Sequence, residues 1–588
     1  MLFAASWQVC HILGLQRPFW PHSPLPHKGA IETSMTSMTS TTDHRRGYDT
    51  QPSTTSGMPP GIPFIVGNEA AERFSFYGMK TILVVFMTQF LHATAGGPDF
   101  MTEPESREWM HLFVASAYFF PILGGILADA FLGKYLTILL LSVVYCLGHL
   151  CLAMMDLPQP LLAATLAPRG WLLAGLTLVA IGSGGIKPCV SAHVGDQFGQ
   201  SNRHLLERVF GWFYFAINFG SFFSTLLTPW LLKHHGPGWA FGVPGILMAL
   251  ATLVFWLGRH SFIHVPPRGP RYFAETFGPE GLAAIFKLVP LYLLVAVFWS
   301  LYDQSGGAWV QQAQQMDRRF LGVAWLESQI QAVNPLLVLF FIPLFSLVLY
   351  PAIERLVPLT PLRKILAGFL LTILAFAIAA HAQRLIDAEA TRFRGVVTAA
   401  AAADGVDPVA TEAAMRDAGL NASADAVAAA TPLPAKNIEP VIEPVASGDP
   451  LETDRRSEAM VQAGIAVTRA GVRLTAAWPS VGWQLLAYVV MTAAEILVSI
   501  TCLEFSYTQA PPQMKSFVMS LSLLSVSLGN LFTALVNAFS LDAAGNSLLA
   551  GASYYWFFCG CMAVATVLLL PVMWTYRPRE YLQDTSAG

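Results

Sequence analysis

About twelve apolar segments, each long enough to cross a lipid bilayer, run through this chain of 588 residues. A helix needs about 20 apolar residues to span the hydrocarbon core. Backbone polar groups in lipid must be satisfied within the segment, which favours helices over barrel strands for runs of this length. The spans are predicted at 61–91, 109–129, 135–156, 171–193, 208–232, 239–260, 284–310, 329–352, 361–383, 483–507, 515–539 and 549–575.

The composition leads to the same fold class. Hydrophobic residues make up 54% of the chain and charged residues only 12%, whereas a soluble protein carries about 25% charge. Lipid must therefore solvate much of the apolar surface. The chain is predicted to be an all-α membrane protein of about twelve transmembrane helices, with the lipid bilayer as an obligatory partner.

Basic residues are distributed unevenly between the two sets of loops that join the spans. The richer set includes Lys134 and Lys364, the poorer set includes Arg107 and Arg169, and the richer set is expected to face the cytoplasm. Both termini then lie inside, and twelve spans divide into two bundles of six helices.

The expected divisions are a disordered tail or misplaced start (1–60), the first bundle (61–262), a cytoplasmic loop (263–283), helices seven to nine (284–385), an extracytoplasmic Ala- and Pro-rich insert (386–481), helices ten to twelve (482–576) and a cytoplasmic tail (577–588).

Other classes of function find little support in the sequence. The net charge of −3 gives no reason to expect a nucleic-acid partner. The pair Cys559 and Cys561 is too close for the usual CxxC metal or redox spacing. No HExxH or GxSxG motif lies in the spans. We therefore expect no enzyme, no metal and no cofactor.

Four charges in the first span carry the strongest functional signal. Glu69, Glu72, Arg73 and Lys80 fall on roughly one helical face, together with Tyr77. A charge at bilayer depth is costly, so it normally faces a cavity or a partner. The alternative is a structural cluster of ion pairs that only ties helices together.

The remaining charges in the spans divide between the two halves. Lys187 belongs to the first half, Asp303 and Glu495 belong to the second, and His111 opens the second span. A cavity between the halves would be positive on one wall and negative on the other, which suits a short zwitterion. A carboxylate that alternates between a lysine partner and a proton would also suit coupling to protons.

Several motifs, taken in order, resemble one family. Residues 69–73 (Glu-Ala-Ala-Glu-Arg) resemble the ExxER signature of the proton-dependent oligopeptide transporters, which belong to the major facilitator superfamily. The further matching stretches are 124–134, 182–198, 213–221, 298–304 and 495–511. The resemblance covers essentially 61–576 without the insert, and it implies a major facilitator fold and import of di- and tripeptides together with protons.

The resemblance also implies roles for individual residues. Proton coupling falls to Glu69, Glu72, Arg73, Asp303, Lys187 and His111. Substrate binding falls to Arg73, Tyr77 and Lys187 for the carboxylate end, to Asn218, Asn334 and Glu495 for the ammonium end, and to Trp299 for a side-chain pocket. Lys80 and Tyr118 are further expected substrate-binding residues. Gating falls to Asp129 and Lys134.

Departures from the family pattern leave alternatives open. The family often has Tyr where this chain has Phe76, and Arg where it has Lys80, which offers a point charge in place of a planar fork. The cargo could instead be another small anion or an amino acid, or the chain could be a sensor that transports nothing. We expect a monomer in the cell membrane, the inner membrane of a bacterium.

Overall fold

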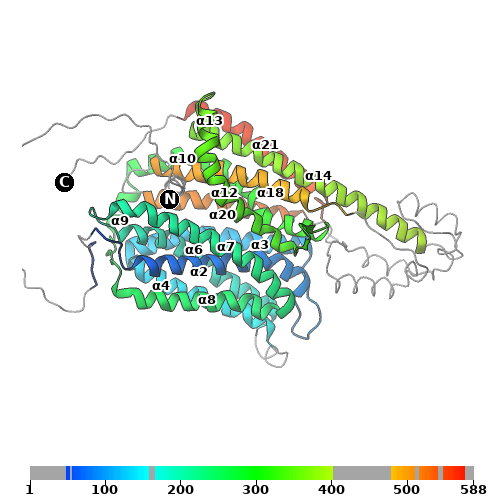
Figure 1. The fold of residues 1–588 in the computed structure, drawn as a ribbon, viewed down its shortest axis with the longest axis horizontal. Helices are drawn as coiled ribbons and strands as arrows, with labels where there is room; N and C mark the ends of the chain where they lie inside the picture. The colour runs from blue at the N-terminus through cyan, green and yellow to red at the C-terminus, as the bar shows by residue number, and fades with distance from the viewer. Residues whose placement is uncertain are drawn as a thin grey trace, which may run out of the picture.

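The computed structural model describes residues 48–52, 56–157, 166–401, 478–509, 515–540 and 547–576. Long helices run side by side along the longest axis of the molecule (Figure 1). Eleven helices in this part of the chain are long and apolar enough to cross a membrane. Helix α2 (Ile62–Val85), continued by a π-helical turn to Phe90, is equally long but carries the charges of the first predicted span. The prediction of an all-helical membrane protein is confirmed.

The first half of the chain forms one bundle. After α2 it contains α3 (Glu103–Ile126), α4 (Lys134–Ala153), α6 (Pro168–Asp196), α7 (Leu206–His235) and α8 (Pro237–Leu257). Their buried apolar side chains form one core, and Val310 is the one buried residue of the described second half that joins it. A short helix, α9 (Arg271–Thr276), lies in the segment that leads to the second bundle.

The second half forms a bundle with its own core. Its helices are α10 (Pro279–Tyr302) with α11 (Ala308–Gln314), α12 (Val333–Leu344) with α13 (Tyr350–Glu354), α14 (Pro361–Ala401), α18 (Gly482–Glu495) with α19 (Thr501–Thr508), α20 (Lys515–Phe539) and α21 (Ala552–Thr575). Strands β1 (Arg319–Phe320) and β2 (Val323–Ala324) form a small antiparallel hairpin between α11 and α12. In Figure 1 most helices of the second half lie above those of the first.

Helix α14 is longer than the predicted span and crosses the expected boundary at residue 385. It has 41 residues, about 60 Å at the usual rise of an α-helix and twice the hydrocarbon thickness of a membrane. In Figure 1 it projects well beyond the other helices. Asp387 lies on this extension and accepts a hydrogen bond from the backbone N–H of Ala552 at 3.0 Å, which caps α21. The rest of the predicted insert up to 477 lies outside the described residues.

The segment before α2 differs from the predicted disordered tail where the structure describes it. The ring of Tyr48 stacks on His264 with 4.0 Å between centroids, and the N–H of His264 donates to the carbonyl of Asp49 at 2.7 Å. The segment before α2 therefore packs on histidine side chains of the loop after α8. The predicted tails 1–47 and 577–588 lie outside the described residues.

Close helix contacts in the first bundle depend on glycine. A Cβ atom on Gly124 of α3 would overlap the backbone of Gly185 in α6. We expect Gly124→Ala to destabilise the fold by about 1–3 kcal/mol, the usual cost of inserting a methyl group into a packed interface. Thermal unfolding in detergent would measure it. The matched control is Gly560→Ala, since no atom lies within 4 Å of a Cβ at that helical position. Equal melting temperatures for both variants would contradict the packing role.

Candidate functional site between the two bundles

A cavity of about 260 Å³ lies between the two bundles. A second hollow of about 300 Å³ shares several of its walls, including Tyr77, Tyr302 and Glu495, so the two form one branched space. Among the predicted site residues, those that line this space are Tyr77, Lys80, Tyr118, Asn218, Trp299, Asp303, Asn334 and Glu495. The halves of the chain therefore contribute opposite walls of one site.

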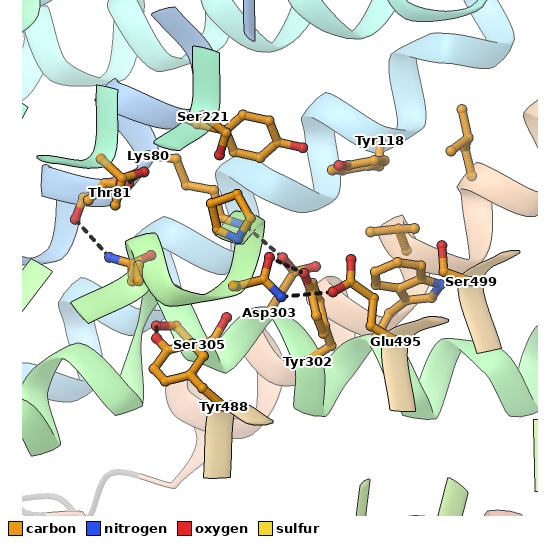
Figure 2. A pocket seen from close by; sticks show the side chains of 18 of the residues that line it. Lys80, Thr81, Tyr118, Ser221, Tyr302, Asp303, Ser305, Tyr488, Glu495 and Ser499 are labelled. Atoms are coloured by element: carbon orange, nitrogen blue, oxygen red, sulfur yellow. Dashed lines mark hydrogen bonds and ion pairs between the residues drawn. The ribbon is translucent and has the colours of Figure 1, made fainter. Parts of the chain in front are cut away.

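The charged and polar side chains face each other across this space. In Figure 2, Lys80, Tyr118 and Ser221 come from the first bundle, and Tyr302 and Glu495 lie opposite them on the second. The cavity thus has a basic group on one wall and carboxylates on the other. That arrangement matches the field expected for a short zwitterion.

One ion pair crosses between the bundles. The Nζ atom of Lys80 lies 2.6 Å from Oδ1 of Asp303, and both side chains are largely buried. The amide of Asn530 donates to the other carboxylate oxygen at 2.7 Å. Asp303 is placed by the turn that follows α10, because the 3₁₀ segment Asp303–Gly306 begins there. A buried carboxylate with two donors is held firmly as long as the bundles stay together.

His111 extends this network into the first bundle. Its Nδ1 atom lies 2.7 Å from Oδ1 of Asn530, and its side chain is fully buried. The sequence placed His111 at the opening of a span, but α3 begins at Glu103, so the imidazole lies two turns inside the helix. Lys80, Asp303, Asn530 and His111 form one chain of polar contacts.

The acidic motif of α2 is a compact buried cluster. The Nε atom of Arg73 lies 2.7 Å from Glu69 Oε1 and 3.1 Å from Glu72 Oε2. Ser183 of α6 donates to Glu72 Oε1 at 2.6 Å. Spacing of one helical turn brings Glu69 and Arg73 together, as the sequence predicts. Arg73, Glu69 and Glu72 face each other here and do not line the cavity.

Lys187 is held by aromatic rings and does not line the cavity either. Its Nζ atom is buried, 4.1 Å from the ring centre of Phe76 and 4.0 Å from that of Tyr118. Within the described residues this atom has no hydrogen-bond partner. Because Tyr118 is itself part of the cavity wall, the ammonium lies one side chain behind the surface that a ligand would touch. A cation between two rings is attracted by their faces, and a carboxylate can compete for it.

The opposite wall centres on Glu495. Asn334 donates from Nδ2 to Glu495 Oε2 at 2.8 Å, and the hydroxyl of Tyr302 donates to Asn334 Oδ1 at 3.4 Å. Glu495 is the last residue of α18, directly before a π-helical turn.

Two other predicted binding residues also line the cavity. The side chain of Asn218 donates to the carbonyl of Tyr214 in its own helix. Trp299 packs edge-on against Tyr302, with 5.2 Å between ring centroids.

The two predicted gating residues lie at the opposite end of the first bundle from Arg107. Lys134 pairs with Asp196 at 2.7 Å. The carbonyl of Asp129 accepts the N–H of Arg268 at 2.7 Å, which ties the loop between the bundles to the end of α3. The sequence grouped Asp129 with Lys134 but did not identify Asp196 as the partner, because that contact joins α4 to α6.

Several residues of the site are absent from the sequence-based set. Tyr302 and Ser499 line the cavity, and Asn530 bridges Asp303 and His111. An Asn in an apolar span was a detectable signal, since an amide at that depth needs a partner. Within the described residues, no group of three His, Cys, Asp or Glu could hold a metal ion.

Two helical bundles around a polar cavity at mid-depth define a multi-pass membrane transporter of the major facilitator type. The model of the POT family matches residues 135–278, 273–403 and 459–557. Solute carrier family 15 member 2 of Rattus norvegicus is 30% identical, over 90% of this chain and 91% of its own length. Peptide transporter family 1 of Drosophila melanogaster is 29% identical, over 90% of this chain and 89% of its own. The chain belongs to the POT family.

Solved structures agree with this assignment. The crystal structure of an auto inhibited POT family peptide transporter has a TM-score of 0.66 and 31% identity, and the match covers 90% of this chain and 99% of that one. The in meso crystal structure of the POT family transporter PepTSo has a TM-score of 0.64 at 31% identity, over 88% of this chain and 99% of that one. The predicted family and fold are confirmed, and the chain is not an enzyme.

Proposed function

We propose that this chain is a symporter that imports di- and tripeptides together with protons by alternating access. The observation that carries the proposal is the cavity whose first wall bears Lys80 and whose second bears Asp303 and Glu495. A short peptide has an ammonium at one end, which finds Glu495, and a carboxylate at the other, which finds Lys80 once it competes with Asp303 for the lysine ammonium. The relatives, which include peptide transporter family 1 of Drosophila melanogaster, support this choice of cargo.

Alternating access requires the cavity to open to one side at a time. Lys80 and Asp303 join the bundles on one side of the cavity, together with the hydrogen bond from Gln331 of the second bundle to the carbonyl of Thr81 in the first. These ties lie toward the Arg107 end, where α3 begins. The second hollow extends the other way, along Phe210 and Phe213 near the start of α7. The described conformation is therefore closed at the Arg107 end.

We place the Lys134 end, with both termini, in the cytoplasm, because loops at that end carry more Lys and Arg. The Arg107 end then faces outward and is called the outer end below. The membrane is the cell membrane, which in a bacterium is the inner membrane. The unit of transport is one chain, since a single copy supplies both walls of the cavity. Protons drive the cycle, and no cofactor takes part.

Uptake into liposomes tests the proposal directly. Purified protein is reconstituted, and entry of labelled dialanine is followed with and without an inward proton gradient. Accumulation above the equilibrium level only when the gradient is imposed supports the proposal. Unlabelled tripeptide should compete with the label, whereas free alanine and nitrate should not. Competition by alanine or nitrate, but not by tripeptide, would favour an amino acid or an anion as the cargo. If no solute accumulates, the chain would instead be a sensor that transports nothing.

The hydroxyl of Ser183 offers a milder test of the acidic cluster. Ser183→Ala removes the donor that lies 2.6 Å from Glu72, and a hydrogen bond to a charged group contributes about 1.5–3 kcal/mol. We expect gradient-driven uptake to fall about tenfold, since that is the equivalent of about 1.4 kcal/mol. Exchange of labelled for unlabelled peptide at equal pH should persist. Ser142→Ala is the control, because within the described residues its buried hydroxyl has no partner. Equal uptake by both variants would contradict the role of Ser183.

A further inference from the structure

Helices α3 and α20 belong to different bundles, pack directly against each other and lie next to each other in Figure 1. Polar contacts join them at three successive levels. Ser527 donates to the carbonyl of Ala115 at 2.7 Å. One turn closer to the outer end, Asn530 Oδ1 lies 2.7 Å from His111 Nδ1. The antiparallel helices are therefore joined at several levels, and the contact between Asn530 and His111 belongs to the site already described.

The outermost of these levels is Arg107. Its Nε atom donates to Asn537 of α20 at 2.9 Å, and its Nη1 atom donates to Gln311 of α11 at 2.9 Å. The guanidinium carbon also lies 4.6 Å from the ring centre of Tyr554 in α21. All three partners belong to the second bundle, whereas Arg107 belongs to the first. The sequence treated Arg107 as a loop residue, but the structure buries it in α3 with 8% exposure.

The charge balance at Arg107 differs from that at Lys80. Among the described residues, the carboxylate paired with its guanidinium is Glu103, at 3.9 Å, and that side chain is 49% exposed. The close partners are neutral amides and a phenol ring. Burying a cation against neutral partners recovers only part of its lost hydration. A polar cavity of about 330 Å³ lined by Glu103, Arg107 and Gln311 lies beside it, and water can reach the guanidinium again once the bundles separate.

We propose that Arg107 is a second outer lock, separate from the Lys80–Asp303 pair, that holds the outer ends of the bundles together through neutral partners. The two hydrogen bonds of Arg107 and its contact with the Tyr554 ring cross between the bundles, so the outer end cannot open until all three break. Because no buried carboxylate among the described residues pairs with Arg107, its contacts favour the closed state only moderately, and the cation regains its hydration when the outer end opens. The inference rests on alternating access within the proposed function. It adds a positioning residue that does not contact the cargo.

Reaction of a buried cysteine tests the lock without any cargo. Ala308 is 2% exposed and lines the cavity beside Arg107, so Ala308→Cys should react with a membrane-impermeant maleimide only when the outer end opens. Cells that carry this substitution are labelled from outside, and the chain without it gives the background of the native cysteines. Adding Arg107→Ala should raise the labelling rate about tenfold, because hydrogen bonds from a charged group are lost. Asn537→Ala removes the same tie from α20 and should raise the rate as well.

Arg169→Ala is the matched control. Arg169 also lies at the outer end and pairs with Asp99 at 2.8 Å and Glu105 at 2.7 Å, but both partners belong to the first bundle. Its loss should leave the labelling rate unchanged. Faster labelling in both Arg107→Ala and Asn537→Ala, and not in Arg169→Ala, supports the lock. An unchanged rate in the Arg107 and Asn537 variants, or an equal rise with Arg169→Ala, overturns it. Failure of dialanine uptake in the parent protein would count against the proposed cargo and would leave the labelling result intact.

Discussion

Replacing Asp303 with Asn is expected to reduce gradient-driven peptide uptake at least about 100-fold. The substitution keeps the shape of the side chain but leaves the ammonium of Lys80, 2.6 Å away, buried without its counter-charge. Removing one partner of a buried ion pair costs about 3–5 kcal/mol, and each 1.4 kcal/mol is about a factor of ten in an equilibrium. Closure of the outer end becomes rare, and the carboxylate that could exchange a proton is gone.

Two further variants separate these causes. The double variant Lys80→Met with Asp303→Asn removes both charges, and a buried pair replaced by neutral groups is often tolerated. Closure, measured by protection of Ala308→Cys from a maleimide, should recover, whereas driven uptake should not. Asp317→Asn is the control, since Asp317 lies outside the cavity and pairs with Arg319, an exposed residue of the hairpin, at 2.9 Å. Driven uptake by Asp303→Asn within tenfold of the parent would contradict the assignment.

The spans were predictable because lipid leaves few options for the chain. A segment of about 20 apolar residues must satisfy its own backbone, so its length and composition identify a helix whatever its neighbours are. The ends of helices are less constrained. Helix α14 continues to Ala401, well past residue 383, where the apolar signal in the sequence stops. The start of α3 at Glu103 was missed for the same reason, because its first turn is polar.

The site was predictable to the extent that a charge within a span is conspicuous. Lys80, Asp303 and Glu495 stand out in apolar sequence, and all of them line the cavity. The pairing of these charges depends on which helices are neighbours, and the sequence alone does not show that. Lys134 pairs with Asp196. Lys187 lies between the rings of Phe76 and Tyr118, and among the described residues no carboxylate oxygen is within hydrogen-bond distance of its ammonium.

Uncharged partners were the hardest residues to find. Asn530 connects Asp303 to His111, and Asn334 holds Glu495 at 2.8 Å. An amide has the same donors and acceptors wherever it lies, so its importance depends on its neighbours. Arg107 was missed for a different reason. A charge near the end of a span is expected to lie in water, but the structure buries this one. Polar residues near span ends therefore need a structure before they can be assigned.

Glu495 should distinguish the two ends of a peptide. Glu495→Gln removes the negative charge, but the new amide oxygen can still accept the hydrogen bond that Asn334 donates at 2.8 Å. The wall should therefore keep its shape. A hydrogen bond between charged groups contributes about 1.5–3 kcal/mol, so affinity for dialanine with a free amino terminus should fall about 10- to 100-fold. Affinity for N-acetyl-dialanine, which has no ammonium, should change less than about threefold.

Competition against one labelled peptide measures both affinities in the same preparation. Glu504→Gln is the matched control, because Glu504 lies on the continuation of the same transmembrane segment, in α19, and does not line the cavity. It should leave both affinities unchanged. Equal losses for free and acetylated peptides in Glu495→Gln would mean that the carboxylate supports the cavity wall without binding the amino end. The peptide would then have to lie in the opposite direction or contact a different acid, and among the described residues Asp303 is the other carboxylate on the cavity wall.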